Sequence, residues 1–570
     1  MRSIWSMRYK WFIRSMWDQV ARCRHISKID FTGCVCFGYN AYIHFTITLK
    51  LITMLKNAFK PLFAVFTCLL LSANALFAQK PAAFIAATPE SQGVSSAGIN
   101  DFLDAAGKSK NEFHSIMILR HGKVIAQGWW NPYGPELRHT LYSVSKSFTS
   151  TAIGFAVSEK LLSLDDKVVS FFPKSLPDTV KPYLAALTVK DLITMSVGQS
   201  PDPTGKIPFT TDDWVKAFLA TPILDKPGSK FLYNSMVTFM ASAIVQKVTG
   251  QKELDYLKPR LFDPLGIKGE DWEVNKQGIN TGGWGLRLKT GDLAKMGQLY
   301  LQKGMWKGKQ ILPKAWIEEA TTFKIDNAPG VAQSKKDSSD WMQGYCYYFW
   351  RCRHNGYRAD GAFGQYIIVL PEQDAVIAIT SETANMQDEL NLIWKHLLPA
   401  MHPKALPADN AGDDKLKRHL AALRLPPPAN EGKGNPTLSK AFEIGKNDLN
   451  ISSISFNTVN NMCSVTLKKD GKNYKIDFAP GRWLAGKTAM QGPGLIAGAR
   501  EDFSILQPYK VDCSYGWKDA NTLQLVLRYI ESPHSETITC HFSDKKLDAE
   551  AEYSFTYGTK KIKLHGEQAK

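Results

Sequence analysis

The stretch LYSVSKSFTSTAIGF, residues 141–155, decides how the rest of this sequence is interpreted. It carries a serine, Ser143, and a lysine, Lys146, at the start of an apolar segment with helical periodicity. In a helix, a spacing of three places both side chains on one face, about one turn apart. Ser145 and Ser147 have no lysine three positions later. An apolar helix has no structural need for a lysine in its first turn, so the pair is a catalytic candidate.

The chemistry of this pair favours acyl transfer. A serine hydroxyl is a poor nucleophile until a base removes its proton. A buried lysine can be that base, because burial favours the neutral amine and lowers its pKa. The helix N-terminus also offers backbone N–H groups to a developing negative charge. The S-x-x-K motif is short enough to occur by chance, but its setting predicts that Ser143 is a nucleophile and Lys146 its base.

The segments around this helix predict an α+β domain over residues 85–402. Two strands are predicted within residues 112–130 and three more within 343–381. Helical patterns fill the region between these two groups, and a helix over 386–401 follows them. Strands from both ends of a region with helices in its middle predict one antiparallel sheet flanked by helices.

A separate all-β domain is expected at the C-terminus. Residues 424–437, RLPPPANEGKGNPT, are rich in proline and glycine and are predicted to be a linker. From 438 to 566 the apolar residues alternate with period two, as in half-buried strands. This pattern predicts a sandwich or a small barrel.

The N-terminal segment predicts export. Residues 54–78 contain Lys56 and Lys60, then an apolar run, then the small-residue site Ala73-Asn74-Ala75. This order is typical of a secretory signal peptide, with a membrane anchor as the alternative. A signal peptide acts at the N-terminus of a chain, so residues 1–53 are expected to be an upstream extension that is not used. The protein is therefore expected to be periplasmic or secreted, without a stable membrane span after signal removal.

Composition narrows the classes of partner. The net charge is +17, but no arginine-rich arm or basic run supports nucleic-acid binding. Five cysteines follow the signal peptide, and disulfides among Cys463, Cys513 and Cys540 are possible for an exported chain. No cysteine or histidine spacing indicates a metal site, so neither a metal nor an organic cofactor is expected.

Five further segments follow in an order that points to a family. They are LTVKDLITMSVG (187–198), KPGSKFLYNS (226–235), LFDPLGI (261–267), GGWGLRL (282–288) and GAFGQYIIVLP (361–371). Together with the S-x-x-K pair, they resemble the serine β-lactamase, penicillin-binding-protein (DD-peptidase) and esterase family, particularly the branch that includes 6-aminohexanoate-dimer hydrolase. The resemblance covers about residues 85–400. It implies a β-lactamase-like fold and an acyl-serine intermediate.

The resemblance assigns further site residues. Tyr233 matches the first position of the family's Tyr-x-Asn motif, which implies a proton relay between serine, lysine and leaving group. Ser235 stands where the family usually has asparagine, so the usual contact with a substrate amide is in doubt. Gly361 fits the end of the third motif, and the Ala362 N–H is a candidate oxyanion donor beside the Ser143 N–H.

The third motif is usually Lys-Thr-Gly or His-x-Gly, and two literal matches are set aside. Lys289-Thr290-Gly291 precedes a helical pattern in which Thr290 or Asp292 resembles a cap, and His354-Asn355-Gly356 resembles a hairpin turn. The matching context is Ala359-Asp360-Gly361, which has no basic residue. That loss argues against a substrate anchored by a β-lactam carboxylate.

The expected function is therefore an exported serine hydrolase that acts on a small-molecule or peptide-like ester or linear amide. A β-lactamase or DD-peptidase acting on penicillins or cell-wall peptides is the alternative. A catalytically weak binding module on the same fold is a third interpretation. The sequence does not determine the substrate or the oligomeric state.

Overall fold

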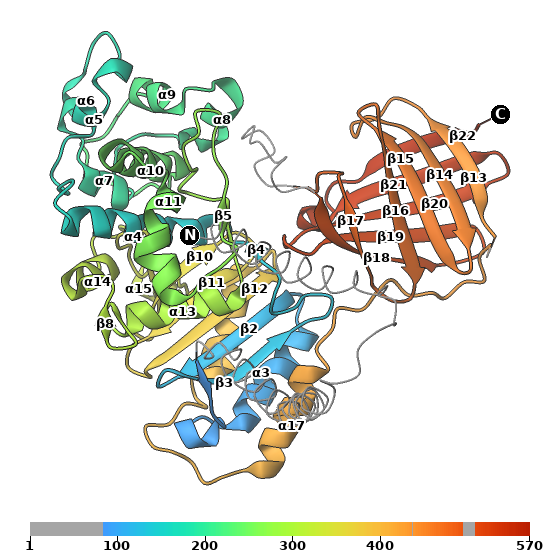
Figure 1. Cartoon of the computed structure of the whole chain (residues 1–570), viewed down its shortest axis with the longest axis horizontal. Coiled ribbons are helices and arrows are strands. Elements are labelled where there is room, and N and C mark those ends of the chain that lie inside the picture. The colour runs from blue at the N-terminus through green and yellow to red at the C-terminus, as the bar shows by residue number, and fades with distance from the viewer. Residues whose placement is uncertain (1–83, 436, 494–507, 570) are drawn as a thin grey trace, which may run out of the picture. The chain divides into compact units, whose positions relative to one another are not determined.

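The computed structural model describes residues 84–435, 437–493 and 508–569 (Figure 1). The expected extension 1–53 and signal peptide 54–78 lie outside the described residues. All described residues belong to one compact unit, Ala83–Lys570. Within the described part of the chain, no helix is both long and apolar enough to cross a membrane.

A seven-stranded sheet forms the centre of the first domain. Its strand order is β1-β3-β2-β12-β11-β10-β9, with β1 parallel to β3 and every other pair antiparallel. Strands from both ends of the domain meet where β2 pairs with β12, as the α+β prediction requires. The strands are β1 Ile85–Ala86, β2 Glu112–Arg120, β3 Lys123–Trp129, β9 Trp350–Arg351, β10 Tyr357–Gly361, β11 Gln365–Leu370 and β12 Ala375–Glu382.

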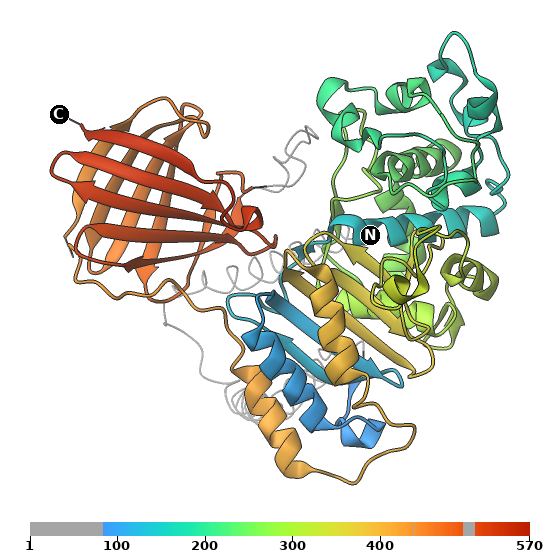
Figure 2. The same cartoon turned by 180° about the vertical axis from the view of Figure 1, so that it is seen from behind.

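Helices cover both faces of this sheet, because alternate side chains along each strand point to opposite sides. On β12, Val376 and Ala378 join the core shared with α13, whereas Ile377 and Ile379 join the core beneath α3. Figure 2 shows α3, α16 and α17 on the face opposite to α13. These helices are α3 Ser96–Lys108, α13 Thr290–Leu301, α16 Met386–Leu392, continued by the π-helix η6 Ile393–Leu397, and α17 Asn410–Ala421.

A helical region between β3 and β9 carries α4, which spans Ser145–Ser158, and α10, which spans Ser235–Thr249. Gly250 ends α10 with a positive φ of 70°. The shorter helices are η1 Glu90–Gln92, η2 Tyr142–Val144, α5 Val168–Phe171, η3 Pro173–Ser175, α6 Pro182–Ala186, α7 Val189–Ile193, η4 Pro203–Gly205, α8 Ile207–Thr210, α9 Trp214–Ala220, α11 Glu253–Leu257, the π-helix η5 Lys258–Phe262, α12 Asp263–Leu265, α14 Lys314–Thr321 and α15 Gln333–Lys336. Two small sheets complete the domain, one of β4 His139–Thr140, β6 Leu286–Leu288 and β5 Asp271–Trp272, the other of β7 Met305–Trp306 and β8 Lys309–Gln310.

The C-terminal domain is all-β, as predicted, and its sheet closes on itself. Neighbouring strands pair antiparallel in the order β16-β15-β14-β13-β22-β21-β20-β19-β18, and β16 then pairs with β18 in parallel. The nine strands therefore form a small barrel rather than a sandwich, and β17 pairs with β18 beside the closure. The strands are β13 Ser439–Ile444, β14 Ile451–Val459, β15 Met462–Lys469, β16 Lys472–Pro480, β17 Leu484–Thr488, β18 Tyr509–Trp517, β19 Thr522–Tyr529, β20 Ser535–Ser543, β21 Lys546–Tyr553 and β22 Ile562–Gln568; the 3₁₀ helix η8 is Ser554–Thr556.

Hydrogen bonds fix the connection between the two domains at its first residues and near its middle. Leu425 N donates to Asn131 O at 2.8 Å, and Trp517 N donates to Asn430 Oδ1 at 2.9 Å. The predicted linker is thus fixed by hydrogen bonds rather than left free in solvent. All five cysteines among the described residues are buried free thiols, so the possible disulfides of the C-terminal domain are not formed here.

Candidate active site

The structure brings Ser143 and Lys146 together. Ser143 lies in η2, immediately before α4, and Lys146 lies in the first turn of α4. Lys146 Nζ is 2.9 Å from Ser143 Oγ, 3.1 Å from Ser235 Oγ and 2.8 Å from the carbonyl oxygen of Gly283. The amine is therefore held by three oxygen atoms, one of which is the candidate nucleophile.

Burial changes the proton affinity of this amine. Lys146 is 1% exposed, and desolvation lowers its pKa to about 7, while the charges of Asp202 and Asp360 act in the opposite direction. A lysine with this pKa is neutral in a large fraction of molecules near neutral pH. It can then accept a proton, which an ordinary lysine cannot do at that pH.

Tyr233 completes the group. Its ring stacks on Trp350, with centroids 5.5 Å apart and planes at 24°, and Lys146 Nζ lies 4.8 Å from its centroid. Burial, helped by the negative charge of Asp360, raises the Tyr233 pKa well above its ordinary value, although the Ser143 side chain lies close enough to the Tyr233 hydroxyl to act on this pKa in the lowering direction. The phenol therefore keeps its proton at neutral pH and is placed to relay one.

The residue order Tyr233-Asn234-Ser235 has a local explanation. Asn234 is the N-cap of α10: its Oδ1 accepts from Met236 N at 2.9 Å, and its Nδ2 donates to Gln199 Oε1 at 3.1 Å. This asparagine is fully buried and stabilises the start of the helix. The side chain that contacts Lys146 is that of Ser235, whose Oγ lies 3.1 Å from Nζ.

Gly361 allows a close approach of two backbone segments. A Cβ atom at this position would lie 2.1 Å from Leu141 O and 3.1 Å from Ser143 N, so any larger residue would push β10 away from the nucleophile. Ala362 follows directly. Within the described residues, neither the Ser143 N–H nor the Ala362 N–H takes part in a hydrogen bond of the fold. Both amides are thus available to bind an oxyanion.

The third motif position holds a buried ion pair. Asp360 Oδ2 accepts from Arg358 Nε at 3.0 Å and forms an ion pair with Nη2 at 2.9 Å, and the Arg358 guanidinium also packs over Trp341 at 4.4 Å. Ala359 carries no charge, and Arg358 is committed to its partners inside the protein. Sequence reasoning missed this pair because Arg358 lies outside the motif.

The two literal matches to the third motif lie elsewhere, as expected. Lys289-Thr290-Gly291 stands at the start of α13, with Lys289 as its N-cap. Of the two predicted capping residues, Thr290 makes no cap bond, since its Oγ1 lies 2.6 Å from Ser115 Oγ, whereas the Asp292 carboxylate interacts with the backbone of Lys289. His354 and Asn355 have φ values of 59° and 53° in the turn between β9 and β10. Among the described residues, no group of three or more His, Cys, Asp and Glu side chains could hold a metal ion.

The chain is similar to several known proteins. The family model described as Beta-lactamase matches residues 104–399. A 6-aminohexanoate-dimer hydrolase from Paenarthrobacter ureafaciens is 25% identical over 284 residues, which cover 46% of this chain and 71% of that protein. A lovastatin esterase from Penicillium rubens is 27% identical over 157 residues, 23% of this chain and 39% of the esterase. A penicillin-binding-protein homologue from Caulobacter crescentus has a TM-score of 0.44 at 15% identity, covering 53% of this chain and 97% of that structure.

Proposed function

Because this chain belongs to the beta-lactamase family, whose members include serine esterases, amidases and DD-peptidases, we propose that it is an exported serine hydrolase that cleaves an ester or a linear amide. One observation carries the proposal: a buried amine with a pKa of about 7 lies 2.9 Å from the Ser143 hydroxyl. That arrangement supplies both a nucleophile and a base of matched strength.

The first half of the reaction forms an acyl-enzyme. Lys146 accepts the Ser143 proton as Oγ attacks the carbonyl carbon of the substrate. The carbonyl oxygen becomes an oxyanion, which the N–H groups of Ser143 and Ala362 bind. Tyr233 passes a proton to the leaving alcohol or amine as the bond to the carbonyl carbon breaks, and recovers one from Lys146.

The second half releases the acid. A water molecule loses a proton to the Lys146–Tyr233 pair and attacks the acyl carbon. The oxyanion forms in the same place, and Ser143 Oγ leaves with a proton returned from Lys146. Each residue ends in its starting state, so turnover needs no further reactant.

The substrate class rests on what lies beside Gly361. A substrate with a carboxylate next to the scissile bond needs a cation at that edge of the site. The motif position that would supply this cation is Ala359. The neighbouring Arg358 guanidinium forms an ion pair with Asp360 at 2.9 Å. This favours an uncharged ester or linear amide over a β-lactam or a cell-wall peptide.

Export rests on the sequence pattern of residues 54–78, and a periplasmic or secreted location is part of the proposal. Intact mass of the protein recovered from the producing cell tests it. Cleavage after Ala75 or Ala78 is expected, whereas a chain that retains residues 54–78 would contradict export.

Active-site labelling tests the chemistry. The full chain is treated with a fluorophosphonate or with a penicillin, and the modified residue is identified by peptide mass mapping, with Ser143→Ala as the matched control. Fluorophosphonate on Ser143 without penicillin acylation is expected. Penicillin on Ser143 would favour the β-lactamase or DD-peptidase alternative, and labelling that survives S143A would reject the proposed nucleophile.

A further inference from the structure

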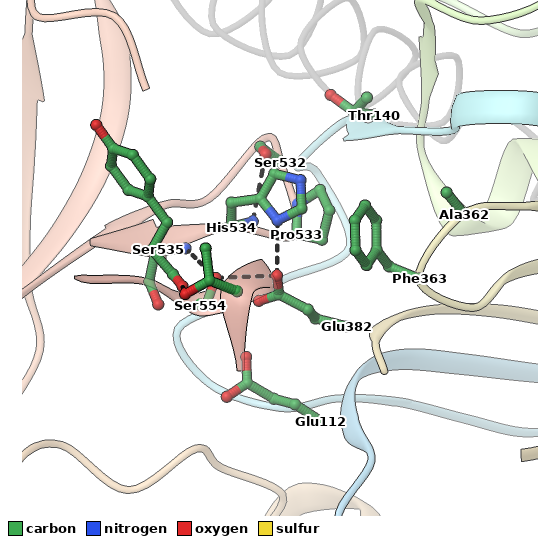
Figure 3. Close-up of polar contacts among 12 residues, drawn as sticks. Glu112, Thr140, Ala362, Phe363, Glu382, Ser532, Pro533, His534, Ser535 and Ser554 are labelled. Carbon is green, nitrogen blue, oxygen red and sulfur yellow. Dashed lines mark hydrogen bonds and ion pairs between the residues drawn. The ribbon is translucent and has the colours of Figure 1, made fainter. Parts of the chain in front are cut away.

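The C-terminal domain inserts one side chain behind the candidate active site. The turn between β19 and β20 carries His534, which is fully buried. Figure 3 shows its imidazole facing Glu382 of the first domain, with the ring of Phe363 beside it. Phe363 follows Ala362 in the chain, so the C-terminal domain touches the segment that carries a proposed oxyanion donor.

Both ring nitrogens of His534 have partners in the first domain. Nδ1 lies 2.6 Å from Glu382 Oε1, which also accepts from Ser554 Oγ at 2.9 Å. Nε2 makes a hydrogen bond with the hydroxyl of Tyr142. In the neutral imidazole, a proton on Nδ1 that Glu382 accepts leaves Nε2 to accept from the Tyr142 hydroxyl.

These contacts involve the residues next to both proposed oxyanion donors. Tyr142 directly precedes Ser143, and its ring packs edge-on against Phe363 with centroids 5.4 Å apart. The Phe363 ring in turn lies edge-on to His534 at 4.8 Å. One imidazole from the C-terminal domain thus contacts the neighbour of each backbone amide assigned to the oxyanion.

The backbone at these two neighbours needs such support. Tyr142 has φ 48° and Phe363 has φ 67°, so both occupy the left-handed region, which is unfavourable for bulky residues. Such conformations persist only where the surrounding structure fixes them. A shift of either residue would move the Ser143 N–H or the Ala362 N–H away from the oxyanion.

We propose that His534 is a positioning residue for the oxyanion site, so that the C-terminal domain is part of the catalytic apparatus. The inference rests on the proposed function, because it assigns a support to the same two amides. His534 does not touch the substrate. It acts through Tyr142 and Phe363, and Glu382 fixes its orientation.

The β19–β20 hairpin that carries His534 makes further contacts with the first domain. Arg528 donates to both carboxylate oxygens of Glu112, at 2.6 and 2.8 Å, and Thr140 N donates to Glu531 O at 3.1 Å. Tyr133 donates to Ser532 O at 3.1 Å. These contacts hold the domains together without His534, so its replacement is expected to leave the interface formed.

The test is a set of variants assayed on an uncharged p-nitrophenyl ester. In Tyr142→Phe and His534→Ala, kcat is expected to fall about 10- to 100-fold, because the oxyanion is stabilised only in the transition state. KM is expected to stay within about twofold for the same reason. His534→Gln keeps an acceptor for Tyr142 and should recover part of the loss. The double variant Y142F/H534A should be no slower than the slower single variant, since both act through one contact.

Glu531→Gln is the matched control in the same turn. It breaks the ion pairs of Glu531 with Arg138 and Lys510, both at 3.1 Å, but keeps the backbone contact with Thr140. Its kcat should match that of the unmodified protein. If H534A is not recovered folded, Y142F, which loses a single oxygen atom, carries the same prediction.

The outcomes separate this inference from the proposed function. If the unmodified protein hydrolyses the ester, S143A does not, and Y142F and H534A both turn over at the full rate, the positioning role is wrong and the proposed function stands. An equal loss in E531Q and H534A would also overturn it, because the interface alone would then explain the effect. If S143A keeps the activity, the proposed function itself fails.

Discussion

The low pKa of Lys146 predicts a specific pH dependence of acylation. The amine must be neutral to accept the Ser143 proton, and burial lowers its pKa to about 7. The neutral fraction is then about one eleventh at pH 6 and about ten elevenths at pH 8. Because acylation scales with that fraction, kcat/KM should rise about tenfold between these two pH values and then level off.

The assay is initial-rate hydrolysis of a p-nitrophenyl ester, followed at the isosbestic wavelength of the product so that pH does not change the signal. Lys146→Arg keeps a permanent charge and should abolish turnover at every pH.

Asp202→Asn tests whether the titrating group is Lys146. The Asp202 charge raises the Lys146 pKa, so its removal should move the acid limb to lower pH. A rate that continues to rise to about pH 10, the ordinary range of lysine, would refute the reasoning. An acid limb that D202N leaves in place would assign the titration to another group.

Three further predictions concern the site and the domain interface. Tyr233→Phe should lower kcat about 100-fold with KM little changed, measured on the same ester, because the proton relay is lost. Gly361→Ala places a methyl group 2.1 Å from Leu141 O, so β10 must move from Ser143; kcat should fall about 100-fold, while a calorimetric melt shows whether the fold survives. Arg528→Met removes the arginine from the Glu112 carboxylate, which then keeps its contact with His114 Nε2 at 3.0 Å, and urea unfolding at pH 7 should show a loss of about 3 kcal/mol in the free energy of unfolding. The ion pair holds the Glu112 pKa below its ordinary value of 4.5, so its contribution is complete above that pH and the difference between R528M and the unmodified protein should shrink as the pH falls below it.

The sequence was sufficient where local pattern determines structure. The period-two alternation of ISSISFNTV corresponds to β14, Ile451–Val459, without a shift at either end. The spacing of Ser143 and Lys146 was enough to place them on one face, because helical geometry is fixed once the segment is helical. A glycine after a helical pattern likewise marks the end of a helix, as Gly250 does for α10, because glycine adopts the left-handed conformation readily.

Local sequence patterns did not predict the elements whose structure depends on contacts between residues far apart in the chain. The first of the three strands predicted within residues 343–381 covers the aromatic-rich segment 343–353, but only Trp350–Arg351 forms a strand there. Its aromatic neighbours fill the core, as where Tyr345 packs edge-on against Trp350. Helix α17 went unrecognised because its burial depends on α3, to which His419 Nδ1 is joined at Asn100 Oδ1, 3.1 Å away. The contact between Tyr142 and His534 spans 392 residues, so no spacing rule indicates it.

The odd number of strands in the C-terminal barrel explains why the barrel closes through a parallel pair. A ring in which every neighbouring pair runs antiparallel needs an even number of strands, because direction alternates at each step. Nine strands cannot satisfy this condition, so one pair must run in the same direction, and here it is β16 and β18. That pair is matched only at Ala479 with Ser514 and Pro480 with Tyr515, and Pro480 has no N–H to donate. Thermal opening of the ring should therefore begin along this line, with amides beside it exchanging hydrogen for deuterium before those between β14 and β15.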